Sequence, residues 1–154
     1  MSPRHAIIDW NDRLKLGIVI VDRQHERLVE LTNNLHLACL RSPDTANRFF
    51  ITATHEAVEY VNYHFTTEEK LMIFLKYPGY QRHRTEHQSF VKEVLRQSSM
   101  FTTGRNFIPN RFVQFLKEWV LSHIAVEDKA MVDYILRLKH HDKLLQIFSK
   151  PANS

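Results

Sequence analysis

The sequence has 154 residues, 44% of them hydrophobic and 25% charged, with a formal net charge of +4. This length suits one domain with a substantial core. Basic residues are interleaved with acidic ones instead of forming the long run of a nucleic-acid-binding arm, and no apolar segment approaches the length of a membrane span. The first residues lack the apolar core of a signal sequence, so we expect a cytoplasmic protein with no nucleic-acid partner and no membrane span. The single cysteine, Cys39, excludes an intrachain disulfide.

Helix formers dominate the composition, and only three glycines and five prolines interrupt them. Apolar residues at spacings of three and four predict four long helices, which cover about residues 22–41, 44–77, 80–98 and 109–138. We expect Asp22 to cap the first helix, Asp44 or Thr45 to start the second, and Pro109 to lie in the first turn of the fourth. The short connections favour an all-α fold, an up-down-up-down four-helix bundle.

The two ends of the chain are predicted to lie outside the four helices. Residues 1–20 show no sustained helical period, which predicts an N-terminal arm packed on the domain. The bundle takes residues 21–138, and residues 139–154 form a C-terminal helical extension, either a fifth short helix or a bent continuation of the fourth. The last residues, from Pro151, are expected to fray. We therefore predict a single domain over residues 1–154.

Polar residues with metal-binding side chains recur on every predicted helix. His64 precedes Glu68 by four residues, and His83 precedes His87 by the same spacing, which returns to nearly the same face of an α-helix. A lone core histidine is usually satisfied by hydrogen bonds, so a purely structural bundle is the simplest alternative. Five imidazoles directed inward from four helices are too many for an uncharged core, and they predict a metal site. The candidate ligands are His25, His64, Glu68, His83, His87, His123 and Asp128.

The number of donors favours two metal ions over one. Five imidazoles and two carboxylates exceed the four ligands of a structural zinc site. If both carboxylates and an oxide or hydroxide bridge two six-coordinate metals, these donors fill all but one of the coordination positions. On a straight α-helix, however, His123 and Asp128 lie about 140° apart. The sequence therefore predicts that Asp128 reaches between the two metals while His123 binds one of them.

The order of these residues resembles the hemerythrin family, in particular its bacterial branch, the bacteriohemerythrins. The matching pattern is a histidine in the first helix, then His-x-x-x-Glu, His-x-x-x-His and His-x-x-x-x-Asp, together with the Asp9-Trp10 arm and the segment from Trp119 to Ile124. The resemblance covers about residues 5–138. It implies a non-haem di-iron centre (Fe2+/Fe3+) with a bridging oxide or hydroxide. In that centre one six-coordinate iron takes His83, His87 and His123, the open iron takes His25 and His64, and Glu68 and Asp128 bridge.

The resemblance also implies a function, which is reversible dioxygen binding at the open iron for carriage, storage, delivery or sensing. Besides dioxygen, an oxygen-using enzyme or a signalling partner would fit this role. The family's apolar oxygen pocket corresponds here to Leu28, Phe65, Trp119, Val120 and Ile124. Ordinary core packing is the simpler interpretation for any one of these five residues. A dry wall would serve both purposes, because it keeps solvent protons away from the bound oxygen.

The main alternative function is catalysis by a di-iron enzyme acting on peroxide, nitric oxide or oxygen. Ferritin-like di-iron sites use mostly glutamates with Glu-x-x-His pairs, whereas this site is rich in histidine and has two carboxylates. That donor balance favours the diferrous state, so we expect an oxygen-binding protein and not an enzyme. Glu86 and Glu127 lie beside ligands and are candidates for hydrogen bonding to them, although a solvated helix face is the simpler interpretation.

Overall fold

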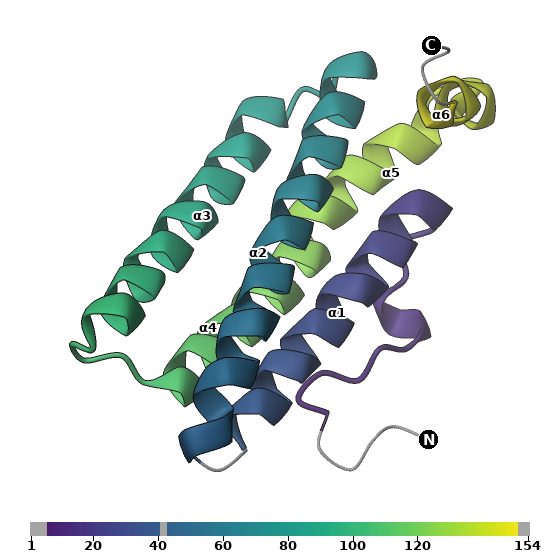
Figure 1. Cartoon of the computed structure of the whole chain (residues 1–154). Helices are drawn as coiled ribbons and strands as arrows, with labels where there is room; N and C mark the ends of the chain where they lie inside the picture. The colour runs from purple at the N-terminus through teal and green to yellow at the C-terminus, as the bar shows by residue number, and fades with distance from the viewer. Residues whose placement is uncertain (1–5, 41–42, 151–154) are drawn as a thin grey trace.

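The computed structural model describes residues 6–40 and 43–150, and it confirms an all-α bundle with a short helix at the C-terminal end. Figure 1 shows consecutive helices running up and down beside one another. The predicted end of the first helix at residue 41 and the fraying from Pro151 lie outside the described residues. The helices are α1 (Val19–Cys39), α2 (Pro43–Phe74), α3 (Tyr80–Thr103), α4 (Pro109–His123), α5 (Lys129–Arg137) and α6 (His141–Ser149).

The start of α1 differs from the prediction, because Asp22 lies in the first turn and is not the N-cap. The helix begins at Val19, and the Asp22 carboxylate accepts the backbone N–H groups of Leu16 at 2.7 Å and Gly17 at 3.1 Å. Gly17 has a φ of 109°, a backbone conformation that side chains with a Cβ rarely adopt. Asp22 therefore fixes the sharp approach of the arm to the helix instead of capping it.

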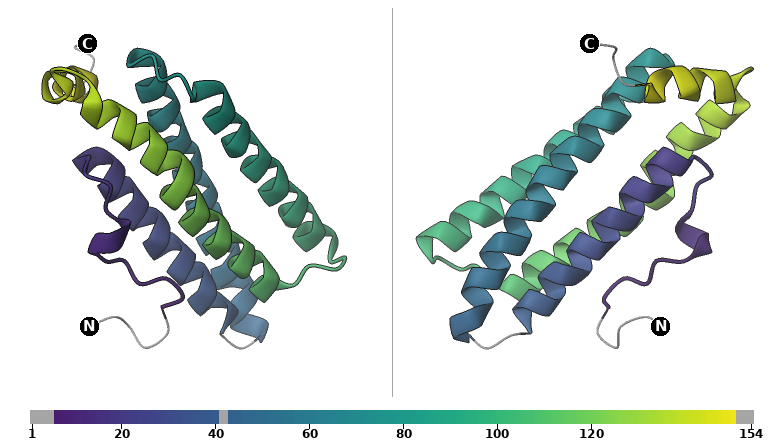
Figure 2. Two further views of the ribbon diagram at one scale, coloured as in Figure 1. Left: turned by 180° about the vertical axis from the view of Figure 1, so that it is seen from behind. Right: turned by 45° about the vertical axis from the view of Figure 1, so that its right-hand side comes forward.

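The predicted arm packs along α1, where one side chain holds its backbone. The Asn33 amide oxygen accepts the N–H groups of Ile7 and Ile8, both at 3.0 Å, and its amide nitrogen donates to the Ile8 carbonyl at 2.9 Å. Ile8 is buried against Val29 and Val120. A short 3-10 turn, Asp12–Leu14, then leads back to the start of α1. The arm thus forms an additional apolar layer over α1 and α4 (Figure 2).

The buried face in the first turns of α2 differs from the one that apolar spacing predicts. Spacings of three and four put Phe49 and Ile51 on the buried stripe, which is wrong: they are 45% and 53% exposed, and Phe50 between them is buried. The Phe50 ring lies 5.4 Å from that of Phe101 and 6.1 Å from that of Phe112. Three consecutive apolar residues do not show which one faces inward, because that depends on the rotation of the docked helix.

The ends of α3 and α4 differ from the predicted helix ends. α3 continues through the serines at positions 98 and 99 and ends at Thr103, before Gly104 with a φ of 68°. The predicted fourth helix is not a single α-helix: a π-helical turn, η2 (Ile124–Asp128), separates α4 from α5. The C-terminal extension is a separate helix, α6, which lies across the end of the bundle (Figure 2).

Two apolar clusters fill the bundle, and the candidate ligands lie between them. One cluster includes Leu35, Phe90 and Phe112, and the other includes Leu71 and Met131. Along each bundle helix the ligand positions fall between residues of these two clusters, so the polar groups occupy the middle of the core. Among the described residues, no helix has both the length and the apolar character needed to cross a bilayer.

Candidate metal centre

All seven predicted ligands are buried, with at most 5% of any residue exposed. The structure brings them together in two groups, and within each group one ligand atom per residue lies within 4.8 Å of all the others. Two carboxylates, Glu68 and Asp128, belong to both groups. The first group is completed by three imidazoles and the second by two: His83, His87 and His123 in the first, His25 and His64 in the second.

Glu68 on α2 directs one oxygen towards each group. Its Oε1 lies 3.3 Å from Nε2 of His64 and 3.6 Å from Nε2 of His25. Its Oε2 lies 3.1 Å from Nε2 of His87 and 3.4 Å from Nε2 of His83. His64 and Glu68 are four residues apart on one helix, so the α-helical period places both side chains on the inward face.

Asp128 has the same arrangement from the opposite side of the bundle. Its Oδ2 lies 2.8 Å from Nε2 of His25, while its Oδ1 lies 3.0 Å from Nε2 of His83 and 3.1 Å from Nε2 of His123. Each carboxylate therefore spans the space between the two groups. This is the geometry that bridging ligands of a metal pair require.

The π-helical turn explains how His123 and Asp128 reach the same site. We predicted them about 140° apart by assuming a straight α-helix, and this was wrong because Ile124–Asp128 is π-helical. A π turn closes its hydrogen bonds between residues five apart, so it aligns positions that an α-helix separates. The wider turn takes up one additional residue, and Met131 in α5 still faces the core with no exposed surface.

Nε2 of His123 lies in hydrogen-bond geometry with Nε2 of His83 at 3.0 Å, but most of the other ligand atoms approach one another closely without hydrogen bonding. Within the described chain, both oxygens of Glu68, both oxygens of Asp128 and Nε2 of His25 and His87 are buried and lack any partner in hydrogen-bond geometry. Buried polar atoms left in this state destabilise a protein. Nitrogen and carboxylate donors directed at common points fit cations such as Fe²⁺, Mn²⁺ or Zn²⁺. The residues present therefore fit two metal ions.

Burial lowers the pKa of the ligand imidazoles, whereas the neighbouring carboxylates raise it. Burial alone lowers the pKa of His25 and His83, but interactions with Asp128 and Glu68 outweigh it and raise these values to about 9 and about 10. Burial dominates at His64 and lowers its pKa to about 4. Burial also opposes ionisation of the two carboxylates, yet the surrounding histidines hold the pKa of each well below its usual range.

Two residues that we did not predict orient the ligand imidazoles. The Gln24 side-chain oxygen lies 2.8 Å from Nδ1 of His64, and the Glu69 carboxylate lies 3.0 Å from Nδ1 of His87. Each oxygen accepts a hydrogen bond from Nδ1–H, which leaves Nε2 of each ring free to face the cluster. Each is next to a ligand in the sequence, but its partner is a histidine on another helix, and this pairing has no signal in the spacing.

The two glutamates that we did consider for this role lie elsewhere. Glu86 is exposed, in agreement with the simpler interpretation of a solvated helix face. Glu127 pairs with Arg82 at 2.9 Å, so its carboxylate links α3 to η2 at the surface.

Aromatic side chains cover the three-histidine group. Phe65 stacks on His87 with ring centroids 3.7 Å apart and an interplanar angle of 8°. Trp119 stacks on His123 at 4.3 Å and 13°, and the Phe65 and Trp119 rings are 5.6 Å apart. These contacts hold two ligand rings in fixed planes and keep water from one side of the cluster.

Two of the other three predicted pocket residues lie on the side of the arm. Val120 and Ile124 are buried in one cluster with Ile8 and Val29, while Leu28 is buried on α1 one turn beyond the His25 position. The structure thus divides the predicted oxygen pocket between two walls of the cluster. That these residues line an oxygen pocket stays a prediction.

Comparison with known proteins agrees with this architecture. A family model described as the hemerythrin HHE cation binding domain matches residues 16–135. The chain is 33% identical over 130 residues to the bacteriohemerythrin of Stenotrophomonas maltophilia (strain R551-3). The aligned region covers 84% of this chain and 82% of that protein. It is 26% identical over 130 residues to the bacteriohemerythrin of Clostridium acetobutylicum, which covers 80% of this chain and 98% of that protein.

A solved structure of wild-type hemerythrin has the same fold, with a TM-score of 0.74 at 22% sequence identity, covering 80% of this chain and 94% of that chain. The family model spans most of the chain, and the similarity to the Stenotrophomonas maltophilia protein extends over most of both sequences. This chain belongs to the hemerythrin family.

Proposed function

We propose that the chain binds dioxygen reversibly at a non-haem di-iron centre. The observation that carries the proposal is the pair of buried ligand groups that share Glu68 and Asp128. Membership of the hemerythrin family and the similarity to bacteriohemerythrins support iron as the metal. When bound, two irons with their oxide or hydroxide would supply the electrons that dioxygen binding needs.

Each residue around the centre has a separate task in this proposal. His83, His87 and His123 hold one iron, His25 and His64 hold the other, and Glu68 and Asp128 join the two. Gln24 and Glu69 fix the imidazole planes, since each accepts a hydrogen bond from Nδ1–H of a ligand on another helix. The apolar walls exclude water, which protects the diferrous centre from irreversible oxidation.

The rival proposal is an enzyme that turns over peroxide, nitric oxide or oxygen at the same centre. Two observations favour binding over turnover: the donors are mostly imidazoles, which bind a metal in their neutral form, and Phe65 and Trp119 lie flat against His87 and His123. Neutral nitrogen donors stabilise the diferrous state relative to carboxylates. A steady-state assay with a reductant and either peroxide or nitric oxide separates the two, because sustained turnover at the centre would favour the enzyme.

The deciding experiment measures iron per chain and the visible spectrum of the reduced protein before and after air is admitted. We expect two irons, a colourless reduced form, and an absorption band that appears in air and disappears under argon. Two irons without a reversible band would refute oxygen carriage, and no bound iron would refute the centre itself. His64→Ala should abolish the band. His55→Ala, on the same helix but exposed and paired with Glu59 at 3.2 Å, is the matched control.

A role in delivery to an oxygen-using enzyme, or in sensing through a signalling partner, is part of this proposal. The assignment of residues 1–154 to one hemerythrin-like domain and the cytoplasmic location stay predictions from the sequence.

A further inference from the structure

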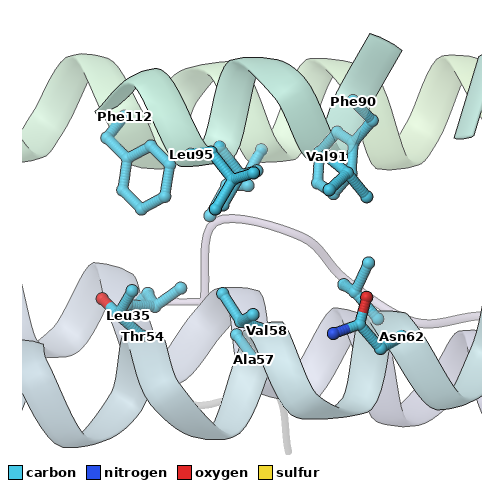
Figure 3. Close-up of a pocket in the computed structure, with 12 residues that line it drawn as sticks. Leu35, Thr54, Ala57, Val58, Asn62, Phe90, Val91, Leu95 and Phe112 are labelled. Atoms are coloured by element: carbon cyan, nitrogen blue, oxygen red, sulfur yellow. The ribbon is translucent and has the colours of Figure 1, made fainter. Parts of the chain in front are cut away.

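A cavity of about 260 Å³ lies between α1 and α2 on one side and α3 and α4 on the other, in the half of the bundle beyond the metal centre (Figure 3). Leu35, Val58, Phe90 and Phe112 are among the side chains that form its walls. The walls are apolar except at Thr54 and Asn62. An apolar void of this size is unfavourable when empty, because the wall atoms lack contacts on one side.

The cavity is long in the direction of the helices and opens along one side. Its lining on α2 extends from Thr54 to Asn62, a distance of about 12 Å along the helix axis. Asn62 is exposed and Leu95 on α3 is 63% exposed, so the opening lies at the seam between α2 and α3. In Figure 3 the side chains of both helices point into the space between them.

One polar atom inside the cavity has no hydrogen-bond partner. The Thr54 hydroxyl oxygen is buried and, within the described chain, unpaired, whereas Thr52 on the same helix donates to the Arg48 carbonyl at 3.1 Å. A buried hydroxyl in this state destabilises the fold unless a water or a ligand group pairs with it. The hydroxyl therefore marks the place where a ligand's own polar group would bind.

We propose that this cavity is a binding site for a small neutral molecule with an unbranched hydrocarbon chain and one hydroxyl group. A cavity of about 150 Å³ with apolar walls is sufficient for benzene, so this larger and longer space takes a medium-chain molecule. The hydrocarbon contacts the leucine, valine and phenylalanine walls, and the ligand hydroxyl pairs with Thr54. The site is independent of iron, because none of its lining residues belongs to the ligand groups.

The test uses 1-octanol as the probe and the full iron-loaded chain, with binding followed by NMR shifts of cavity residues. We expect saturable binding that is lost in Ala57→Leu, because the larger side chain fills the cavity. Thr54→Val keeps the shape and removes the hydroxyl, so we expect binding about 3–10-fold weaker, the effect of one hydrogen bond. Ala130→Leu, at an exposed position of α5, is the matched control and should bind as the native chain does.

The possible outcomes separate clearly. Absence of saturable binding to the native chain, or equal binding to Ala57→Leu, would overturn the site. Equal binding to Thr54→Val would overturn the role of the hydroxyl and the assignment of a hydroxylated ligand. Helix content and iron per chain are measured for every variant, so that loss of folding is not mistaken for loss of binding. A chain without a reversible oxygen band that still binds octanol would refute the proposed function and leave this inference intact.

Discussion

Loading the centre with two divalent metal ions should release about two protons near neutral pH. In the metal-free protein the pKa values of His25 and His83 are raised to about 9 and about 10, so both rings are protonated at pH 7. A ring that binds metal through Nε2 must lose that proton. His64 and Glu68 add none, because their lowered pKa values keep the ring neutral and the carboxylate ionised. His25 and His83, one in each ligand group, therefore supply one proton each.

The same shifts give the pH dependence of metal binding and of stability. Each released proton weakens the apparent affinity of its group about tenfold per pH unit below the pKa of the ring, or about a hundredfold between pH 8 and pH 6. In the metal-free protein, the stabilisation from the raised pKa of His25 is lost as the pH rises through about 9. The lowered pKa of His64 acts at the other end, and destabilises the fold as the pH falls from 6.5 towards about 4. Both changes begin at the ordinary histidine value of 6.5, so the metal-free protein should be most stable near pH 6.5.

Calorimetric titration with Zn²⁺ measures the proton count, because this ion takes the same nitrogen and oxygen donors without changing oxidation state. The apparent enthalpy is plotted against the ionisation enthalpy of several buffers, and the slope gives the protons released. We expect a slope near two at pH 7, reduced by one in His25→Ala and unchanged in the exposed control His55→Ala. A slope near zero, or no change in His25→Ala, would refute the assignment of protons to these rings.

Substitutions at three positions test other parts of the centre. Glu68→Ala removes a donor from both groups, so both metals should be lost, and elemental analysis that still finds two per chain would contradict the shared role. Phe65→Ala should lower the free energy of unfolding by about 3–5 kcal/mol in urea titrations, and Phe65→Leu by clearly less, because leucine fills more of the space against His87; equal losses would argue against packing as the cause. Ile124→Ser should keep the metals but speed air oxidation, followed by visible absorbance, since a hydroxyl admits water beside His123, and an unchanged rate would contradict a dry wall.

Sequence spacing predicted those parts of the site that depend on regular α-helical geometry. His64 with Glu68, and His83 with His87, follow from a period that is the same in any straight helix. The spacing of His123 and Asp128 did not fit this period, because the backbone between them forms a π turn. No local residue preference predicts that turn.

Contacts between side chains on different helices could not be predicted from the sequence for a different reason. Gln24 and Glu69 act on histidines of other helices, so their role depends on how the helices dock. The burial of Phe50 in place of Phe49 also depends on the final rotation of α2. Local periodicity identifies a helix and its approximate face, but tertiary packing decides which of several neighbouring side chains points inward.

The positions of the ligand residues along the chain tie metal binding to the folding of the whole bundle. The group with His25 and His64 needs α1, α2 and η2, and the group with His83, His87 and His123 needs α2, α3, α4 and η2. Within the described chain, no pair of consecutive helices contains a complete group. The free energy of metal binding therefore stabilises the docking of α1, and of α4 with η2, on α2 and α3. The loaded bundle should unfold in one cooperative step. Among the described residues α6 contributes no ligand, so metal binding does not directly stabilise the docking of this helix.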